Sequence, residues 1–138
     1  MPAKDIFHDI VRLALEKDGW RITNDPLYIK IGKTEMYIDL AAERLIAAQK
    51  GEQKIAVEIK SFLRESEMTE FHLALGQFLN YRLALKQKLP DIVLYLAIPT
   101  DIHNTLFSRQ FIQDAIQEYQ VKLLVFDDNT QEIVLWKN

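Results

Sequence analysis

The short apolar run at residues 55–60 carries two charged side chains that could do chemistry, Glu58 and Lys60. Its β-branched residues predict a buried strand, whose side chains alternate between two faces. One face is then wholly aliphatic, and Glu58 and Lys60 share the other. An unpaired buried charge is costly, so the pair needs each other, a metal or a polar cleft. The alternative is a half-exposed strand with a weak Glu–Lys pair.

Asp39 is the second carboxylate in this argument, because it lies near the end of a strand predicted over 35–40. If the two strands are neighbours, Asp39, Glu58 and Lys60 converge at one end of a mixed sheet. Such a set would bind one or two magnesium (or manganese) ions and activate water for phosphodiester hydrolysis. The separation of the two acids exceeds that of a plain hairpin, which predicts a bulge or extra turn. Glu43 is the alternative metal ligand.

A long helix predicted from residue 66 or 67 to 86 adds two polar side chains, Gln77 and Tyr81. They are one turn apart and therefore neighbours on the helix surface. Both could donate hydrogen bonds to a phosphate or to a metal-bound water, although ordinary helix-edge packing is the alternative. Gly76 costs about 1 kcal/mol relative to Ala inside a helix, which predicts close backbone packing at that point.

The first predicted helix, over 5–17, carries His8 and Arg12 one turn apart. They could lie over the same cleft, but a histidine beside an apolar face is more often a hydrogen-bonded packing residue, which is the preferred interpretation. His72 and His103 fit no metal-ligand spacing.

The composition is that of an ordinary globular protein, and residues 1–138 are expected to form a single domain. The net charge of −3 argues against a protein that coats nucleic acid non-specifically with high affinity. It says less about an enzyme that acts on nucleic acid. The chain has no cysteine, which excludes disulfides and thiolate metal sites. The sequence shows no signal peptide and no membrane-spanning run, so a cytoplasmic protein is expected.

The hydrophobic pattern predicts an α/β (α+β) fold with the order αβββαβαββ. Residues 45–49 are assigned to a further strand, although 41–49 also has helix propensity. The connection from the strand at 55–60 through the long helix to 92–98 is expected to be a right-handed parallel crossover. The remaining predicted elements are strands over 27–31, 121–126 and 132–136 and a helix over 105–119.

Taken in order, the first helix, Asp39, the V-E-I-K at 57–60 and the helix with Gln77 and Tyr81 resemble the PD-(D/E)XK nuclease superfamily. The resemblance implies a restriction-endonuclease-like core, a mixed β-sheet flanked by helices. It also implies that Asp39 and Glu58 hold magnesium, that Lys60 assists catalysis and that Gln77 and Tyr81 form the Q-x-x-x-Y motif of some branches. The sequence departs from the pattern because Ile38, and not proline, precedes Asp39.

The sequence also resembles one smaller family, XisH, over essentially its whole length. The segments that carry this resemblance are M-P-A-K-D-I-F-H at 1–8, D-G-W at 18–20, M-Y-I-D-L at 36–40, I-A-V-E-I-K-S-F at 55–62 and A-L-G-Q-F-L-N-Y at 74–81. XisH proteins are called fdxN-element excision controlling factors. The resemblance implies accessory work in DNA excision, alongside a recombinase and a second small factor, XisI.

Two classes of function stay open at this point. The first is a magnesium-dependent nuclease acting on nucleic acid, with DNA as the expected substrate. The second is a catalytically silent module that keeps the nuclease fold and binds DNA or an XisI-like partner. A homodimer with C2 symmetry, formed through the apolar late strands, is a further expectation.

Overall fold

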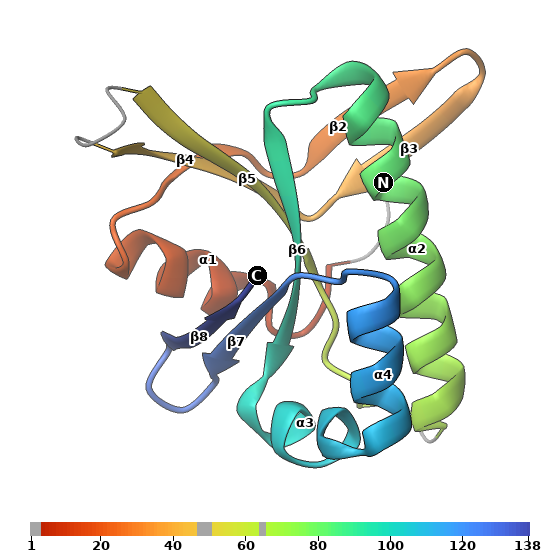
Figure 1. Ribbon diagram of the computed structural model, residues 1–138. Coiled ribbons are helices and arrows are strands. Elements are labelled where there is room, and N and C mark those ends of the chain that lie inside the picture. The colour runs from red at the N-terminus through yellow and green to blue at the C-terminus, as the bar shows by residue number, and fades with distance from the viewer. Residues whose placement is uncertain (1–3, 47–50, 64–65) are drawn as a thin grey trace.

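The computed structural model describes residues 4–46, 51–63 and 66–138, in which helices flank a twisted sheet on both sides (Figure 1). The elements, in chain order, are α1 (His8–Lys17), β1 (Arg21–Asn24), β2 (Leu27–Ile31), β3 (Thr34–Ile38), β4 (Leu40–Ile46), β5 (Gly51–Ile59), α2 (Glu67–Lys88), β6 (Ile92–Pro99), α3 (Thr100–Asn104), a 3₁₀ turn η2 (Leu106–Ser108), α4 (Gln110–Glu118), β7 (Leu123–Asp127) and β8 (Glu132–Lys137).

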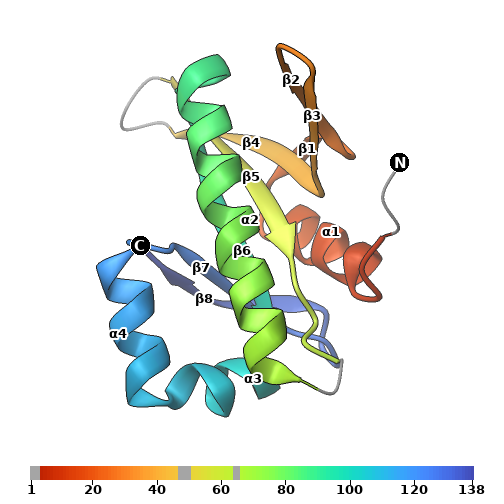
Figure 2. The same cartoon turned by 90° about the vertical axis from the view of Figure 1, so that its right-hand side faces the viewer.

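The main sheet has six strands in the order β1-β4-β5-β6-β7-β8. Its central pairs, β5 with β6 and β6 with β7, are parallel, and the other pairs are antiparallel. The sheet is therefore mixed, and the predicted parallel connection from β5 through α2 to β6 is confirmed. Strands β2 and β3 form a separate hairpin beside the main sheet (Figure 2).

Alternation along β5 divides the core into two clusters. Ile55, Val57 and Ile59 pack with α1 on one face of the sheet, together with Trp20 from the loop after that helix. On the other face, Ala56 joins the cluster formed under α2, α4 and the β2–β3 hairpin. Glu58 follows Ala56 on this second face, so the predicted alternation is confirmed as far as Ile59, where β5 ends.

Local signals explain where the two longest helices end and begin. Gly19 adopts a φ of +91° directly after α1, and the next residue, Trp20, donates its N–H to the carbonyl of Leu15, which is the usual left-handed helix stop. At α2 the Ser66 side chain accepts the Thr69 N–H as an N-cap. These signals set the residue at which α1 ends and the residue at which α2 begins.

The structure differs from the predicted elements in several places. Residues 21–24 form an edge strand, β1, where no strand was predicted. The helix expected over 105–119 is divided into η2 and α4, and an unpredicted short helix, α3, precedes them. The strand expected over 45–49 is the end of β4, and residues 47–50 lie outside the described part of the chain.

The strand expected over 35–40 is interrupted at Asp39. The chain leaves the β2–β3 hairpin after Ile38 and enters the main sheet at Leu40. The ladder between β4 and β5 then runs without a register shift from the Leu40–Val57 pair to the Ile46–Gly51 pair. The long separation of Asp39 and Glu58 is therefore the length of two hairpin arms. Of the two expected causes, a bulge or an extra turn, the bulge was wrong for the described ladder. Within the described residues, no helix is both long and apolar enough to cross a membrane.

Candidate functional site

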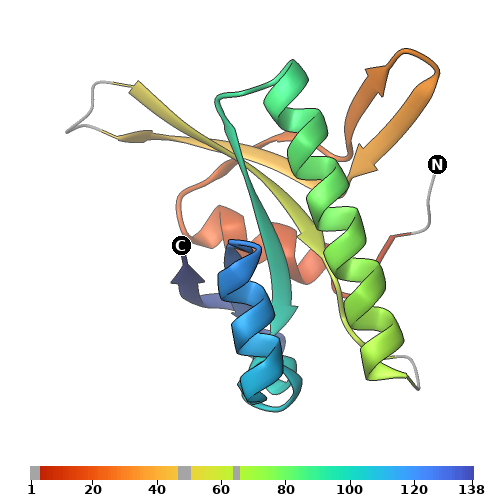
Figure 3. The ribbon, with the colours of Figure 1, turned by 45° about the vertical axis from the view of Figure 1, so that its right-hand side comes forward.

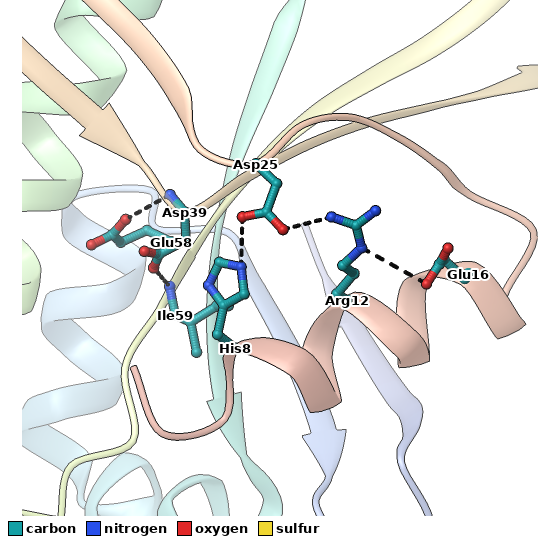
Figure 4. A network of polar contacts seen from close by, with 7 residues as sticks. All are labelled: His8, Arg12, Glu16, Asp25, Asp39, Glu58 and Ile59. Atoms are coloured by element: carbon teal, nitrogen blue, oxygen red, sulfur yellow. Dashed lines mark hydrogen bonds and ion pairs between the residues drawn. The ribbon is translucent and has the colours of Figure 1, made fainter. Parts of the chain in front are cut away.

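Asp39 and Glu58 face each other at the open end of the β4–β5 hairpin, one step beyond the Leu40–Val57 pair. The Asp39 N–H donates to Glu58 Oε1 at 3.3 Å, and the Ile59 N–H donates to Asp39 Oδ2 at 2.7 Å. Each carboxylate thus accepts an N–H group from the opposite strand, as Figure 4 shows. The predicted convergence of the two acids is present in the structure.

Lys60 completes this group from the same face of β5. Its Nζ lies 3.7 Å from Glu58 Oε2, and its side chain keeps 17% of its surface exposed, against 7% for Glu58. Because the Lys60 N–H donates to the carbonyl of Ala97 on β6, the backbone there is held by the parallel neighbour. The ammonium group therefore sits between a buried carboxylate and solvent.

Burial dominates the electrostatics of the two acids. Burial and then the charge of Asp39 raise the pKa of Glu58 to about 8, although Lys60 acts in the opposite direction. Burial also raises the pKa of Asp39, and the hydrogen bond from the Ile59 N–H reduces that effect. At neutral pH the pair therefore favours holding a proton, and a bound cation would compete for that place.

Tyr81 of α2 lies toward this site, and Gln77 stands one turn before it on the same side of the helix. Burial raises the pKa of the Tyr81 hydroxyl to about 12, and the charges of Glu58 and Asp39 add to the effect, which places the ring near both acids. The Gln77 Oε1 is buried and has no hydrogen-bond partner among the described residues. An amide oxygen without a partner can serve as a neutral ligand or receive a proton donor.

Glu43 is not part of this group. Its carboxylate pairs with Arg21 of the edge strand β1. It lies four residues along β4 from Asp39, about 13 Å at the rise of a β-strand. Together with Arg44 and Glu52 it lines a separate pocket of about 490 Å³. The alternative acid is therefore unsuited to the Asp39–Glu58 site.

A second polar network stands beside the two carboxylates and was missed in part from the sequence. His8 Nε2 lies 2.7 Å from Asp25 Oδ1, and Arg12 donates to Asp25 Oδ2 at 2.6 Å (Figure 4). Burial would raise the pKa of Asp25, but the hydrogen bonds from Arg12 and His8 reverse this and lower it. His8 was expected to be a hydrogen-bonded packing residue, and its 3% exposure and bond to Asp25 agree with that.

The network also acts on the site itself. His8 exerts a favourable charge effect on the ionised form of Asp39, and its Nδ1 is buried without a hydrogen-bond partner in the described structure. Only the (i, i+4) spacing of His8 and Arg12 hinted in the sequence that both could bind one acid. The identity of that acid, Asp25, had no local signal.

The described residues contain no group of three or more His, Asp or Glu side chains arranged to hold a metal. The site instead offers two adjacent carboxylates, an ammonium group and a tyrosine hydroxyl, and the unpartnered amide oxygen of Gln77 lies one helix turn from that tyrosine. Such a set can bind a hard cation through oxygen atoms and can contact a phosphate through the ammonium and hydroxyl groups.

Comparisons with known proteins agree with the sequence pattern. A search of the curated proteins gave no match. The family model described as XisH protein matches residues 1–134. Among solved structures, an XisH family protein from Nostoc punctiforme PCC 73102 is 50% identical, with a TM-score of 0.88, and the match covers 97% of this chain and 100% of that one. An fdxN element excision controlling factor protein from Anabaena variabilis is likewise 50% identical, with a TM-score of 0.88 and coverage of 98% and 100%. Since the match extends over nearly the whole fold, including both arms of the hairpin that carry Asp39 and Glu58, the chain belongs to the XisH family.

Proposed function

We propose that this protein processes DNA by metal-dependent hydrolysis of phosphodiester bonds, within a PD-(D/E)XK-type site. The observation that carries the proposal is the pairing of two buried carboxylates, Asp39 and Glu58, beside Lys60 at a strand end. Burying two acids side by side raises the pKa of each and costs free energy of folding. A divalent cation would offset that cost, which gives the arrangement a physical reason to exist.

The donor set fits magnesium or manganese. Magnesium is commonly held by one or two carboxylates and otherwise keeps water or substrate oxygens, so two acids are sufficient. Asp39 and Glu58 would hold the ion, and the buried, unpartnered oxygen of Gln77 is a further neutral donor on that side of α2. When bound, the ion would supply a water of lowered pKa and neutralise charge on the phosphate.

The remaining side chains would bind and orient the substrate. Lys60 would contact a non-bridging phosphate oxygen and stabilise the negative charge that develops during attack. Tyr81 is protonated at neutral pH, as any tyrosine of ordinary pKa would be, and its raised pKa of about 12 keeps it so at higher pH as well. Its hydroxyl can therefore act as a hydrogen-bond donor. The His8–Asp25–Arg12 network would hold α1 against the site and keep positive charge near Asp39.

The family suggests the setting for this chemistry. One relative is named as an fdxN element excision controlling factor, so the proposed substrate is DNA at an excised element. The proposed partners are an XisI-like protein and a recombinase, and the proposed location is the cytoplasm. The net charge of −3 supports a need for a partner, because bulk electrostatics do not attract DNA to this chain.

A second candidate function is a catalytically silent module that binds DNA or a partner protein. Two observations favour it: the acidic net charge and the presence of two, rather than three, acidic or histidine ligands in the described site. The two functions differ in what Lys60 and a chelator should do.

The test is a cleavage panel of single-stranded, duplex and branched DNA with magnesium or manganese, with and without the XisI-like partner. Lys60→Ala should abolish nicking and weaken DNA binding only modestly, since one phosphate contact among several is lost. Lys54→Ala is the matched control, because Lys54 lies on the same strand, exposed and away from the acids. Inactivity of the wild type on every substrate, with binding that survives chelation, would favour the silent module.

A further inference from the structure

A large groove lies on the side of α2 away from the candidate site. It has a volume of about 980 Å³ and is lined by α2, α4, the start of β6 and the segments next to β7 and β8. Figure 3 shows α2 and α4 side by side over the sheet. Gln77 on the site flank and Lys86 in the groove are nine residues apart, about 180° around the helix. The groove and the candidate site are therefore separate surfaces.

The groove is basic although the chain as a whole is acidic. Its charged lining consists of four cations, Arg82, Lys86, Lys122 and Lys137, and one acid, Asp114. The net charge of the whole chain is −3. The Asp114 carboxylate already accepts a hydrogen bond from Gln110 at 2.8 Å. The local field of the groove thus has the opposite sign to that of the molecule and would attract a negatively charged partner.

The cations differ in how far the fold uses them. Arg82 donates to the carbonyls of Tyr119 and Gln120, at 2.8 and 2.9 Å, and so ties α2 to the end of α4. The three lysines have no ion-pair partner among the described residues, and Lys86 and Lys137 are exposed. Arg82 therefore holds the groove in shape, while the lysines are left to contact an occupant.

The rest of the lining suits a peptide. Buried apolar side chains, among them Leu85, Leu94 and Ile116, form the floor, and Val93 keeps 37% of its surface exposed. Exposed glutamines along α4 stand at the rim, and their amides can both donate to and accept from a peptide backbone. A helix or strand with apolar side chains on one face and acids beside them matches this arrangement.

Single-stranded nucleic acid matches it less well. Such ligands are usually held by stacking of bases on exposed aromatic rings. The aromatic residue in the lining, Phe78, is fully buried, and the Arg82 guanidinium lies over its ring at 5.4 Å. The lining therefore offers no ring surface for a base.

We infer that this basic groove is a docking site for an acidic, amphipathic segment of a partner protein. The inference goes beyond the proposed hydrolysis and does not depend on it, because none of Asp39, Glu58 and Lys60 takes part.

The test uses a short synthetic peptide of leucine, alanine and glutamate in helical spacing, labelled with fluorescein, and fluorescence anisotropy at fixed low salt. Lys86→Glu/Lys122→Glu should weaken binding of this peptide on the order of tenfold or more, since it reverses two contacting charges. Lys30→Glu/Lys33→Glu on the β2–β3 hairpin changes the net charge equally and should leave binding nearly unchanged. A matched peptide with glutamine in place of glutamate should bind weakly.

A second measurement locates the peptide. Because the chain has no cysteine, a single Gln117→Cys variant can carry an environment-sensitive dye at the groove rim, and Lys33→Cys carries it at a distant point. The dye at residue 117 should respond to the glutamate peptide, and the dye at residue 33 should not. Absence of binding, equal loss in the two double variants, no response at residue 117, or tighter binding of labelled oligothymidylate would each overturn the inference.

Discussion

Burial and the neighbouring Asp39 carboxylate raise the pKa of Glu58 from 4.5 to about 8, which makes folding depend on pH. Between these values the folded chain keeps a proton that the unfolded chain releases. The free energy of unfolding should therefore fall as pH rises through this range in the absence of metal, by about 5 kcal/mol. Urea unfolding at several pH values should show this slope in the wild type and a flatter one in Glu58→Gln. Glu43→Gln should keep the wild-type slope, and equal slopes in all three proteins would contradict the prediction.

A divalent cation bound by Glu58 should offset the free energy cost of burying this carboxylate in its ionised form. Magnesium at about 100 times its dissociation constant would add about 2.7 kcal/mol to the free energy of unfolding, because it binds the folded state alone. The melting temperature of the wild type should rise with added magnesium or manganese, and that of Glu58→Gln should rise much less. Glu43→Gln serves as the control and should respond like the wild type. A magnesium shift in Glu58→Gln as large as that of the wild type would remove Glu58 from the proposed metal site.

The sequence was sufficient to place Asp39, Glu58 and Lys60 together, because side chains alternate along a strand and the residue number therefore determines the face of the sheet on which each one lies. It was insufficient for Asp25. The Asn24-Asp25-Pro26 segment has ordinary turn chemistry, and only the three-dimensional fold brings this turn over α1. The unpartnered oxygen of Gln77 was equally invisible, since its isolation depends on what packs around it.

Within α2, Gly76 departs from the expectation of close packing. A Cβ atom built at this position would meet nothing within 4 Å, and the residue is exposed. Gly76→Ala should therefore stabilise the protein by about 0.5–1 kcal/mol, through reduced backbone entropy of the unfolded chain. Gly19→Ala is the contrasting variant and should destabilise, because Gly19 has a φ of +91°. Chemical denaturation of both variants checks the two signs, and a loss of stability in Gly76→Ala would mean that this face of α2 is covered.

The link between α1 and the turn before β2 should carry measurable stability. Asp25→Asn leaves His8, which is 3% exposed, with a weaker partner and removes the charge bound by Arg12. We expect a loss of about 1–3 kcal/mol in the free energy of unfolding, the usual cost when a buried polar group loses its partner. Glu16→Gln removes an exposed charge that lies 4.0 Å from the same arginine and should change stability by less than about 0.5 kcal/mol. A midpoint in Asp25→Asn unchanged from wild type would show that the network is not stabilising.

At the level of elements, the helices and strands with a strong hydrophobic pattern could be predicted from the sequence, and those with a weak pattern could not. The buried strands β5 and β6 and the long helix α2 were identified because their apolar patterns are continuous. Strand β1 has only Ile22 partly buried, so it shows no alternation and was missed. The sequence predicts a single helix over 105–119 because no glycine or proline marks the break before Gln110. The chain makes this break at Arg109, which has extended backbone.

At the scale of the whole molecule, β8 forms one edge of the main sheet. Two of its apolar side chains, Val134 and Leu135, are 53% and 41% exposed. An exposed apolar edge strand can pair with the same strand of a second copy about a two-fold axis. The expected homodimer through the late strands therefore stays a prediction, and sedimentation at micromolar concentration checks it. Val134→Lys should shift the protein toward monomer, whereas Leu63→Lys, at an exposed leucine outside the sheet, should not. A clean wild-type monomer would remove the idea.

The reciprocal bonds at the end of the β4–β5 hairpin have a consequence for how the chain finds its fold. A slip of one residue between these strands would turn Glu58 toward the aliphatic cluster under α1 and break both N–H contacts with the carboxylates. Such a misaligned hairpin would bury the Glu58 carboxyl group without a hydrogen-bond partner and would therefore be less stable than the native alignment. The two acids thus act as a check on strand alignment, so that a chain able to assemble the site is also one that has paired its strands correctly.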